Sequence, residues 1–395
     1  MATATPAADK RRTAPLWVRV GGALVLLGVG LFLAMQSASL AASRQNPALS
    51  LMLGLYPSRA AERVAVTQVI ADEAGIRDVS AAQELARQAF TISPARTEAA
   101  AILALAADDA RQAEGLAATR ALSRRGRFLN FASLQLSAGQ EDIEQGLRAT
   151  DRLLTLYPSL RRRLTPVLGT FLVRQDALPI YRQMLQRRPV WAEGFFQLWN
   201  LEPEAQRNLG RLRIELGPDG GVSDRTDQRL VARLASAGHL ADAAELYTLI
   251  SPGGEALSRD MAVDWAADLP PFDWELQNRR DFHARTTTGR PGLRVRIDAG
   301  KGGPIAERLI PVPEGARTLS VTHDLTHAAD RPLQITATCP GNDEGSQAEL
   351  VGEGTTNLVL PAPACDIVQV RLQGRARTGS QPIRGEITGM QFDLN

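Results

Sequence analysis

The sequence predicts a multidomain α + β protein with an N-terminal transmembrane helix, an α-helical repeat solenoid and a C-terminal antiparallel β-sandwich of jelly-roll type. Three observations lead to this prediction. An apolar run at residues 20–35 follows a cluster of basic residues. Between residues 57 and 270, apolar residues recur at the three- and four-residue spacing of helices. After residue 270, short β-prone runs separated by Gly, Pro and Asp replace that pattern.

The N-terminal segment has the composition of a membrane-spanning helix. Lys10, Arg11 and Arg12 precede the apolar run, and small residues extend it to position 42. A helix of about 20 apolar residues crosses the roughly 30 Å of bilayer hydrocarbon, and a basic flank stays on the cytoplasmic side. We therefore expect a cytoplasmic tail at 1–14, an anchor in the bacterial inner membrane at 15–42, and a periplasmic location for the rest.

Two alternatives to a retained anchor stay open. Ser37 and Ser39, or Ser39 and Ala41, form the small-x-small pattern of a signal-peptide cleavage site. A buried helix of a soluble protein is the other alternative. The length of the run favours the anchor, because the apolar part of a signal peptide usually has about 7 to 15 residues.

Composition argues against one class of function. The chain has 395 residues, of which 22% are charged and 44% hydrophobic, and its formal net charge is +2. A nucleic-acid-binding protein normally has a clear basic excess, so no nucleic-acid partner is expected. Lys occurs only at positions 10 and 301, and Ala is abundant. Almost every cation is therefore Arg, which indicates a GC-rich, bacterial genome.

The two cysteines, Cys339 and Cys365, both lie in the C-terminal third of the chain. Two cysteines in one domain of an exported protein favour a single disulfide between them. A buried pair of free thiols and a reactive thiol are the alternatives.

The helical region contains a repeat of about 32 residues. Four prolines follow amphipathic helices at separations of 64, 31 and 63 residues, near multiples of this unit. These prolines are Pro94, Pro158, Pro189 and Pro252. A unit of this length built from two helices indicates a solenoid, which we place at 43–270.

The repeats resemble tetratricopeptide repeats. That family places a small, an aromatic and a medium-sized residue along its second helix and closes the unit with proline. Residues of these types stand at those spacings in Ala177, Tyr181, Met184 and Pro189. The resemblance implies a concave groove that holds a peptide or a helix of a partner protein.

Tyr181, Tyr247 and Trp199 are the candidate contacts in such a groove. The other interpretation is that these rings, together with Phe195 and Phe196, belong to the core of the repeats. For any single ring the core is favoured, because buried aromatic residues are common.

The C-terminal region, 271–395, has the pattern of an all-β domain. We predict strands at 272–276, 293–297, 308–312, 318–323, 333–339, 357–360, 367–372 and 386–394. Short strands at such regular spacing favour an antiparallel sandwich of the jelly-roll type.

This region resembles jelly rolls of the carbohydrate-binding-module and galactose-binding type. The resembling pieces are the opening 272–276, the strand 293–297 with its Gly-rich hairpin, the segment 310–315 and the last strand. Similar domains follow tetratricopeptide arrays in bacterial envelope proteins linked to polysaccharide assembly. Trp274 and Phe282 are the candidate glycan contacts, although the domain has few aromatic residues and no Tyr, which favours a core position for most of them.

Three motifs suggest chemistry but lack the context that it needs. His323 and His327 have the spacing of metal ligands without a third ligand, so surface positions are expected. The glycines at 300–303 predict a hairpin loop rather than a phosphate cradle. Asp273 and Glu275 could form a glycosidase pair on one strand, as a remote enzymatic alternative. We expect no catalytic, metal or cofactor site.

The sequence thus predicts a non-enzymatic periplasmic scaffold or adaptor anchored in the inner membrane. Its repeats would bind envelope proteins of a polysaccharide synthesis or export machine. The alternative function is glycan binding, with the C-terminal jelly roll holding a polysaccharide.

Overall fold

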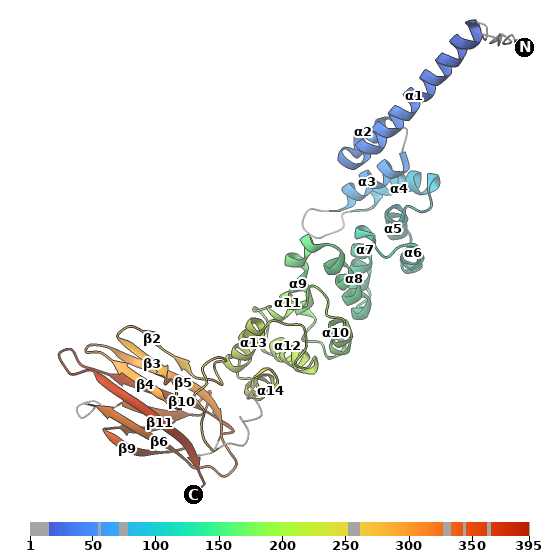
Figure 1. The fold of residues 1–395 in the computed structure, drawn as a ribbon. Helices are drawn as coiled ribbons and strands as arrows, with labels where there is room; N and C mark the ends of the chain where they lie inside the picture. The colour runs from blue at the N-terminus through green and yellow to red at the C-terminus, as the bar shows by residue number, and fades with distance from the viewer. Residues whose placement is uncertain are drawn as a thin grey trace, which may run out of the picture. The chain divides into compact units, whose positions relative to one another are not determined.

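The computed structural model describes residues 16–53, 57–70, 78–251, 261–326, 333–342, 345–361 and 365–394. The chain forms two compact units, Met1–Leu156 and Tyr157–Asn395. The first unit is helical, and the second contains further helices followed by two antiparallel sheets (Figure 1). This confirms the predicted fold class of helices followed by an antiparallel β-sandwich.

Helix α1 (Leu16–Gln45) contains the predicted apolar segment. The stretch Val20–Ser43 has a mean hydropathy of 2.0, and only 6% of it is buried within the protein. Leu24, Leu27 and Leu31 are among its exposed side chains. By length and composition α1 can cross a membrane, as an anchor or as a signal sequence. The predicted tail at 1–14 lies outside the described residues.

The C-terminal end of α1 packs against the helices that follow it. These are α2 (Pro47–Leu53) and α3 (Pro57–Val69). Ser39 and Ser50 are buried, and the Ser50 hydroxyl donates to the Ser39 carbonyl oxygen at 3.0 Å. The Arg63 guanidinium donates to the Ser43 carbonyl oxygen at 2.5 Å. The last turns of α1 therefore belong to the first helical unit.

The rest of the first unit is a series of helical hairpins. Its helices are α4 (Ser80–Ile92), α5 (Thr97–Leu105), α6 (Asp109–Leu122), α7 (Arg127–Gly139) and α8 (Ile143–Leu156). Helices pair as α3 with α4, α5 with α6 and α7 with α8, and α5 also packs against α3 and α7. The approach between α5 and α6 is close, because a Cβ on Gly115 would lie 2.8 Å from that of Ala104. The first unit thus consists of helical hairpins packed against one another.

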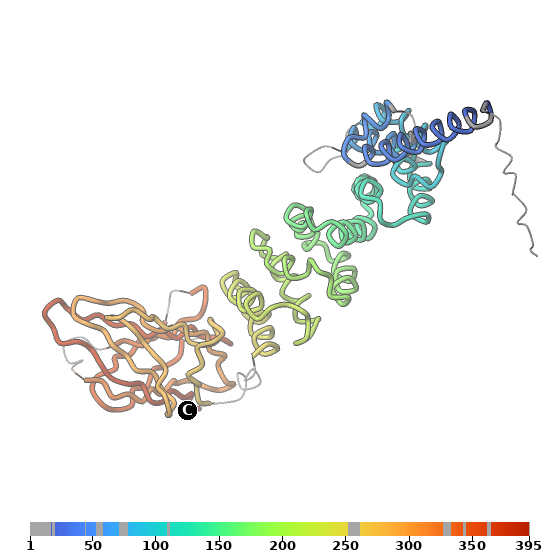
Figure 2. Tube along the Cα trace, turned by 45° about the horizontal axis from the view of Figure 1, so that its top comes forward, coloured from blue at the N-terminus to red at the C-terminus, as the bar shows by residue number. Residues whose placement is uncertain are grey.

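The helices of the second unit follow a similar plan. They are α9 (Arg161–Thr170), α10 (Leu178–Leu185), α11 (Ala192–Phe196), α12 (Pro203–Glu215), α13 (Asp224–Ser236) and α14 (Leu240–Ile250), with single 3-10 turns at Pro158–Leu160 and Gln175–Ala177. Helix α11 packs against α9 and α13, and α12 packs against α10 and α14. In Figure 2 they are the green-to-yellow coils before the sandwich.

A buried ion pair joins α12 to α13. The Arg213 guanidinium donates to both oxygens of Asp227 at 2.7 Å and to the Gly217 carbonyl oxygen at 2.6 Å. Burial raises the pKa of Asp227, and the bonds from Arg213 offset only part of that effect. Gly217 has a φ of +72°, which glycine adopts readily, and the bond from Arg213 to its carbonyl oxygen holds the turn after α12.

Carboxylates cap helix N-termini in the following repeat at three places. Glu62 on α3 accepts the backbone N–H of Glu98 at 3.2 Å, and Glu98 on α5 accepts that of Leu129 at 3.0 Å. Glu193 on α11 accepts the N–H of Ser223 at 3.0 Å. Helix N-termini have unpaired N–H groups and a positive dipole, so each carboxylate holds its helix against the start of a later helix. Burial raises the pKa of Glu98 because these N–H groups compensate only in part.

The sandwich consists of a five-stranded and a six-stranded sheet. Its strands are β1 (Glu275–Leu276), β2 (Asn278–Arg279), β3 (Phe282–Thr286), β4 (Leu293–Ile297), β5 (Gly302–Pro311), β6 (Thr318–Thr326), β7 (Leu333–Thr338), β8 (Gly345–Leu350), β9 (Glu353–Val359), β10 (Ile367–Arg375) and β11 (Ile383–Asp393). The orders are β1-β5-β10-β7-β8 and β2-β3-β4-β11-β6-β9. The chain crosses between the sheets repeatedly, as in jelly rolls.

Several strands differ from the predicted ones for local reasons. The strand predicted at 272–276 shrinks to β1, because Phe272 and Trp274 pack into the core from a loop. Strand β5 begins at Gly302, inside the stretch predicted as a hairpin loop. Strands β2, β3 and β8 are not among the predicted strands; β2 has two residues, and β8 is a polar edge strand with one buried residue.

The segment before β1 is part of the sandwich. The Val263 N–H donates to the Met390 carbonyl oxygen at 2.8 Å, and the Phe392 N–H donates to that of Met261 at 2.7 Å. Val263 and Trp274 lie in the sandwich core. The predicted boundary at 270/271 falls inside this packed segment.

The predicted disulfide is present. Cys339 follows β7 and Cys365 precedes β10, and the two half-cystines are 26 positions apart. Strands β7 and β10 are neighbours in the five-stranded sheet, so the bond joins the ends of paired strands.

Replacing Glu98 by Ala should loosen the start of α7. The change leaves the N–H groups of Phe128 and Leu129 without their acceptor, at a cost of about 1–3 kcal/mol. Hydrogen exchange by mass spectrometry should show faster exchange at residues 126–131. Glu114→Ala, which removes an exposed carboxylate on α6, is the control and should leave exchange there unchanged. Equal protection in both variants would show that the cap does not hold α7.

Candidate functional site

Two of the three predicted groove aromatics are core residues. Tyr181 is fully buried, stacks on Phe195 with ring centroids 5.2 Å apart, and donates its hydroxyl to the Leu168 carbonyl oxygen at 2.5 Å. Burial raises its pKa. Tyr247 is also buried. Neither ring can contact a partner, so the prediction of groove contacts at Tyr181 and Tyr247 is wrong.

Trp199 has the opposite environment. It lies in the loop between α11 and α12, and 77% of its surface is exposed. Arg233 on α13 holds this loop by donating to the carbonyl oxygens of Phe196, at 2.7 Å, and Leu198. Burial lowers the pKa of Arg233. An exposed indole on a fixed loop is a common kind of anchor for a protein partner, because Trp dominates many interfaces.

The predicted glycan contacts are buried as well. Trp274 has no exposed surface, stacks on Trp265 with centroids 5.7 Å apart, and donates its indole N–H to the Asp264 carbonyl oxygen at 3.0 Å. Phe282, Phe272 and Phe392 are core residues too. The sandwich therefore cannot use these rings for stacking on a sugar, because they are buried in its core.

His323 is a buried structural residue, not the surface residue predicted. Its Nδ1 lies 2.9 Å from the Gly352 carbonyl oxygen, and its Nε2 lies 2.9 Å from the Thr356 hydroxyl. The Thr356 contact joins β6 to β9, and the Gly352 contact joins β6 to the residue just before β9. His327 lies outside the described residues. In the ranges that the structure describes, no three His, Cys, Asp or Glu side chains gather as metal ligands would.

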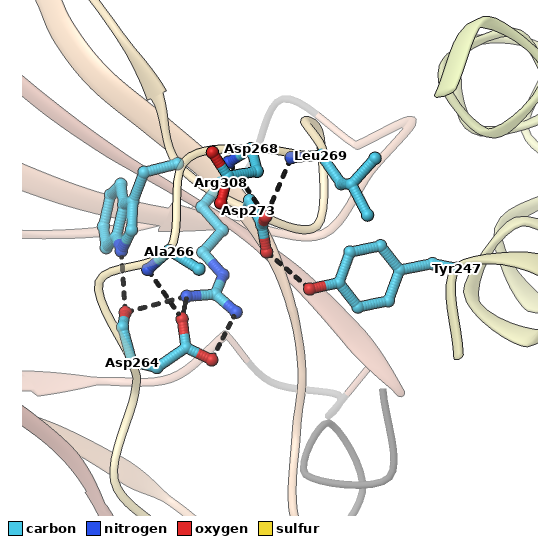
Figure 3. Close-up of polar contacts among 8 residues, drawn as sticks. Tyr247, Asp264, Ala266, Asp268, Leu269, Asp273 and Arg308 are labelled. Carbon is cyan, nitrogen blue, oxygen red and sulfur yellow. Dashed lines mark hydrogen bonds and ion pairs between the residues drawn. The ribbon is translucent and has the colours of Figure 1, made fainter. Parts of the chain in front are cut away.

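A polar network joins the last helix to the sandwich (Figure 3). Tyr247 on α14 donates its hydroxyl to Asp273 Oδ1 at 2.5 Å. Asp273 Oδ2 accepts the backbone N–H groups of Asp268 at 3.1 Å and Leu269 at 2.8 Å. Burial, with the adjacent carboxylate, raises the pKa of Tyr247. The Tyr247 ring also packs on Phe272, with centroids 5.3 Å apart.

Arg308 forms the second part of this junction. It extends from β5, is 2% exposed, and donates to the Asp264 carboxylate at 2.6 Å and to its carbonyl oxygen at 2.8 Å. Burial alone raises the pKa of Asp264, but the hydrogen bonds and charge of Arg308 outweigh it and lower that pKa. Asp264 therefore stabilises the fold above its unfolded-state pKa, and this contribution is lost as the pH falls through the lowered value.

The proposed carboxylate pair of a glycosidase does not converge. Asp273 is buried with its oxygens occupied by three donors, whereas Glu275 is exposed. Asp273 precedes β1, so the two residues do not share the face of a strand. Asp273 therefore has a structural role at the junction between α14 and the sandwich. The sequence pattern alone does not distinguish such a buried acid from an exposed one.

No family model and no curated protein matches this chain. Among solved structures, the chain is similar to TmCBM61, a carbohydrate-binding module solved in complex with beta-1,4-galactotriose. The sequence identity is 8%, and the match covers 35% of this chain and 100% of the other, with a TM-score of 0.26. Such a low TM-score carries no argument about function.

Tyr247→Phe should destabilise the junction between α14 and the sandwich. It removes one hydrogen bond to a buried carboxylate, which costs about 1.5–3 kcal/mol. Asp273→Ala should cost more, because it leaves three donors without an acceptor. Chemical denaturation would measure both changes against Glu275→Ala, an exposed acid two positions away. A Tyr247→Phe protein as stable as the wild type would contradict a stabilising role for this bond.

Proposed function

We propose that the protein is a single-pass scaffold or adaptor of the bacterial inner membrane, with a cytoplasmic N-terminus and a periplasmic bulk. Its helical repeats bind partner proteins of a cell-envelope or exopolysaccharide machine. The observation that supports the anchor is the exposed apolar surface of α1, which only a bilayer or a partner can cover. The proposed role involves neither catalysis nor nucleic acid.

The end of α1 supports a retained anchor rather than a cleaved signal. Both small-x-small patterns, at 37–39 and 39–41, lie inside the continuous helix. Cleavage there would remove or sever the part of α1 that holds Ser39, whose carbonyl oxygen accepts from Ser50. The packed protein thus uses residues that a cleaved signal peptide would discard.

Partner binding is assigned to the helical hairpins, which we identify with tetratricopeptide-like repeats. The caps between successive hairpins support a repeat near the predicted length, since their bonded residues are 36, 31 and 30 positions apart. Trp199 is the proposed contact, as the exposed member of the predicted groove set. The disulfide between Cys339 and Cys365 is suited to an oxidising compartment such as the periplasm.

Crosslinking in the native host followed by affinity purification tests this function. The full chain should recover envelope proteins, and deletion of residues 57–251 should remove them. Trp199→Ala should reduce recovery by about 30-fold, the effect of losing a hot spot worth about 2 kcal/mol.

Ile92→Ala is a matched control, because it truncates another exposed apolar side chain of the repeats. An unchanged set of partners after the deletion would contradict the scaffold function. Unchanged recovery with Trp199→Ala alone would contradict only the assignment of that residue.

A further inference from the structure

Helices α1 and α2 bury and expose the reverse of what a helical pair in a water-soluble protein does. Among the described side chains of the two helices, the fully buried ones are Ser39, Ser43 and Ser50. Two large apolar side chains of α2 face outward, since Met52 is 87% exposed and Leu49 is 48% exposed. A surface helix of a soluble protein turns its apolar side chains inward, whereas helices that pack in lipid put small residues at their contact.

Hydrogen bonds between serines hold α2 beside the end of α1 (Figure 1). Ser50 donates its hydroxyl to the Ser39 carbonyl oxygen at 3.0 Å, and the two hydroxyl oxygens are 3.1 Å apart. The chain turns at Asn46, whose Oδ1 accepts the Leu49 N–H at 3.1 Å. Ser39 precedes the end of α1 at Gln45 by about two turns. Because Ser50 lies beside Ser39, α2 runs back along α1 toward the apolar segment.

The length of α1 sets the depth of α2 in a bilayer. A helix crosses the hydrocarbon with about 20 residues, so a span that begins at Val20 ends near Ser39. Met52 lies two positions beyond Ser50 on the returning helix, which places it at the edge of the hydrocarbon. Between positions 20 and 58 the one charged residue is Arg44, in the last turn of α1 beyond this level. The apolar surface of α1 therefore continues onto α2.

A charged group marks where the hydrocarbon ends. Pro47 has no N–H to pair with the Ser43 carbonyl oxygen, four residues earlier. The Arg63 guanidinium on α3 donates to that oxygen instead, at 2.5 Å. A guanidinium is costly in hydrocarbon, so this level belongs to the headgroups. Ser43 is one helical turn beyond Ser39, which agrees with a boundary near Ser39.

The faces of α2 have different neighbours. Ser50 contacts α1, and Leu51 packs against the core of the first helical unit. Residues three apart lie on one side of a helix, so Leu49 and Met52 share the remaining face. Rotation of α2 to bury that face would remove Ser50 and Leu51 from their contacts. The helical unit therefore leaves Leu49 and Met52 to an apolar environment outside it.

We propose that α2 is a second membrane contact, which inserts the face formed by Leu49 and Met52 into the periplasmic leaflet beside α1. This inference rests on the proposed anchor and extends it. Continuity with the apolar surface of α1 identifies lipid hydrocarbon as the occupant, and the serine contacts are of the kind that lipid favours. Because α2 also packs against α3, insertion holds the first helical hairpin at the bilayer surface instead of on a flexible tether.

Fluorescence quenching of the full chain in phospholipid nanodiscs tests this contact. The two native cysteines are joined to each other, so Met52→Cys adds a single free thiol for labelling with the dye NBD. The exposed Met52 side chain has little packing to lose, so the variant should keep the fold. The label should lose fluorescence when the lipid carries a nitroxide near the top of its acyl chain. It should resist quenching by iodide in the buffer.

Leu122→Cys is the matched control, because it labels another exposed apolar position, on α6, whose contacts are with α5 and α7. Iodide should quench this label and the lipid nitroxide should not. Equal quenching of the Met52 and Leu122 labels by iodide would overturn the proposal. Protection of the Met52 label from both quenchers would overturn the choice of lipid, since a protein surface would then cover α2.

A label at Leu31→Cys, in the apolar part of α1, separates this inference from the anchor itself. A nitroxide deep in the acyl chains should quench it. Quenching of the Leu31 label without quenching of the Met52 label by lipid would overturn the insertion of α2 and leave the anchor intact. If lipid quenches neither label, α1 does not span the bilayer and the anchored scaffold fails together with this inference.

Discussion

The exposed apolar surface of helix α1 is the constraint on which the rest of this account depends. Leu24, Leu26, Leu27 and Leu31 all face outward from a helix that the protein itself barely covers. Apolar surface of this extent is unfavourable in water, which fits a helix that lies in a bilayer as an anchor or belongs to a signal sequence. If α1 stays in place, it fixes the compartment of everything after it, and its own end becomes part of the helical unit through Ser39 and Ser43.

Carboxylates that accept backbone N–H groups join several successive elements. Glu62, Glu98 and Glu193 each accept backbone N–H groups at the start of a later helix. Asp273 accepts the backbone N–H groups of Asp268 and Leu269 together with the Tyr247 hydroxyl. Asp273 is buried and the three glutamates are partly buried, and several donors compensate each carboxylate for lost hydration. They also make the joints specific, since a displaced element would leave donors unpaired.

The sequence predicts features that depend on composition and spacing. The apolar helix, the change from helices to strands near residue 270 and the disulfide between Cys339 and Cys365 all follow from local pattern. The burial of a given ring does not follow from local pattern, because it depends on neighbours distant in sequence. Tyr181 and Trp199 are similar candidates in the sequence. Tyr181 is enclosed by Phe195 and Leu168. Trp199 is exposed on the loop that Arg233 holds from α13. Strand β8 was missed because an edge strand carries little of the apolar signal used to find it.

Side chains that strand register brings together show a similar limit. Alternation in β4 predicts that Arg294 and Arg296 share one side of a strand, but only the register of β3 and β11 places Arg285 and Arg384 beside them.

The redox state of Cys339 and Cys365 in living cells tests the central claim most directly. Trapping free thiols with a maleimide before lysis reports the compartment that the sandwich occupies. This account predicts a disulfide in the full-length, membrane-bound protein and reduced, alkylated cysteines when residues 1–45 are deleted. Reduced cysteines in the full-length protein would place the sandwich in the cytosol and contradict an anchor that delivers it across the membrane.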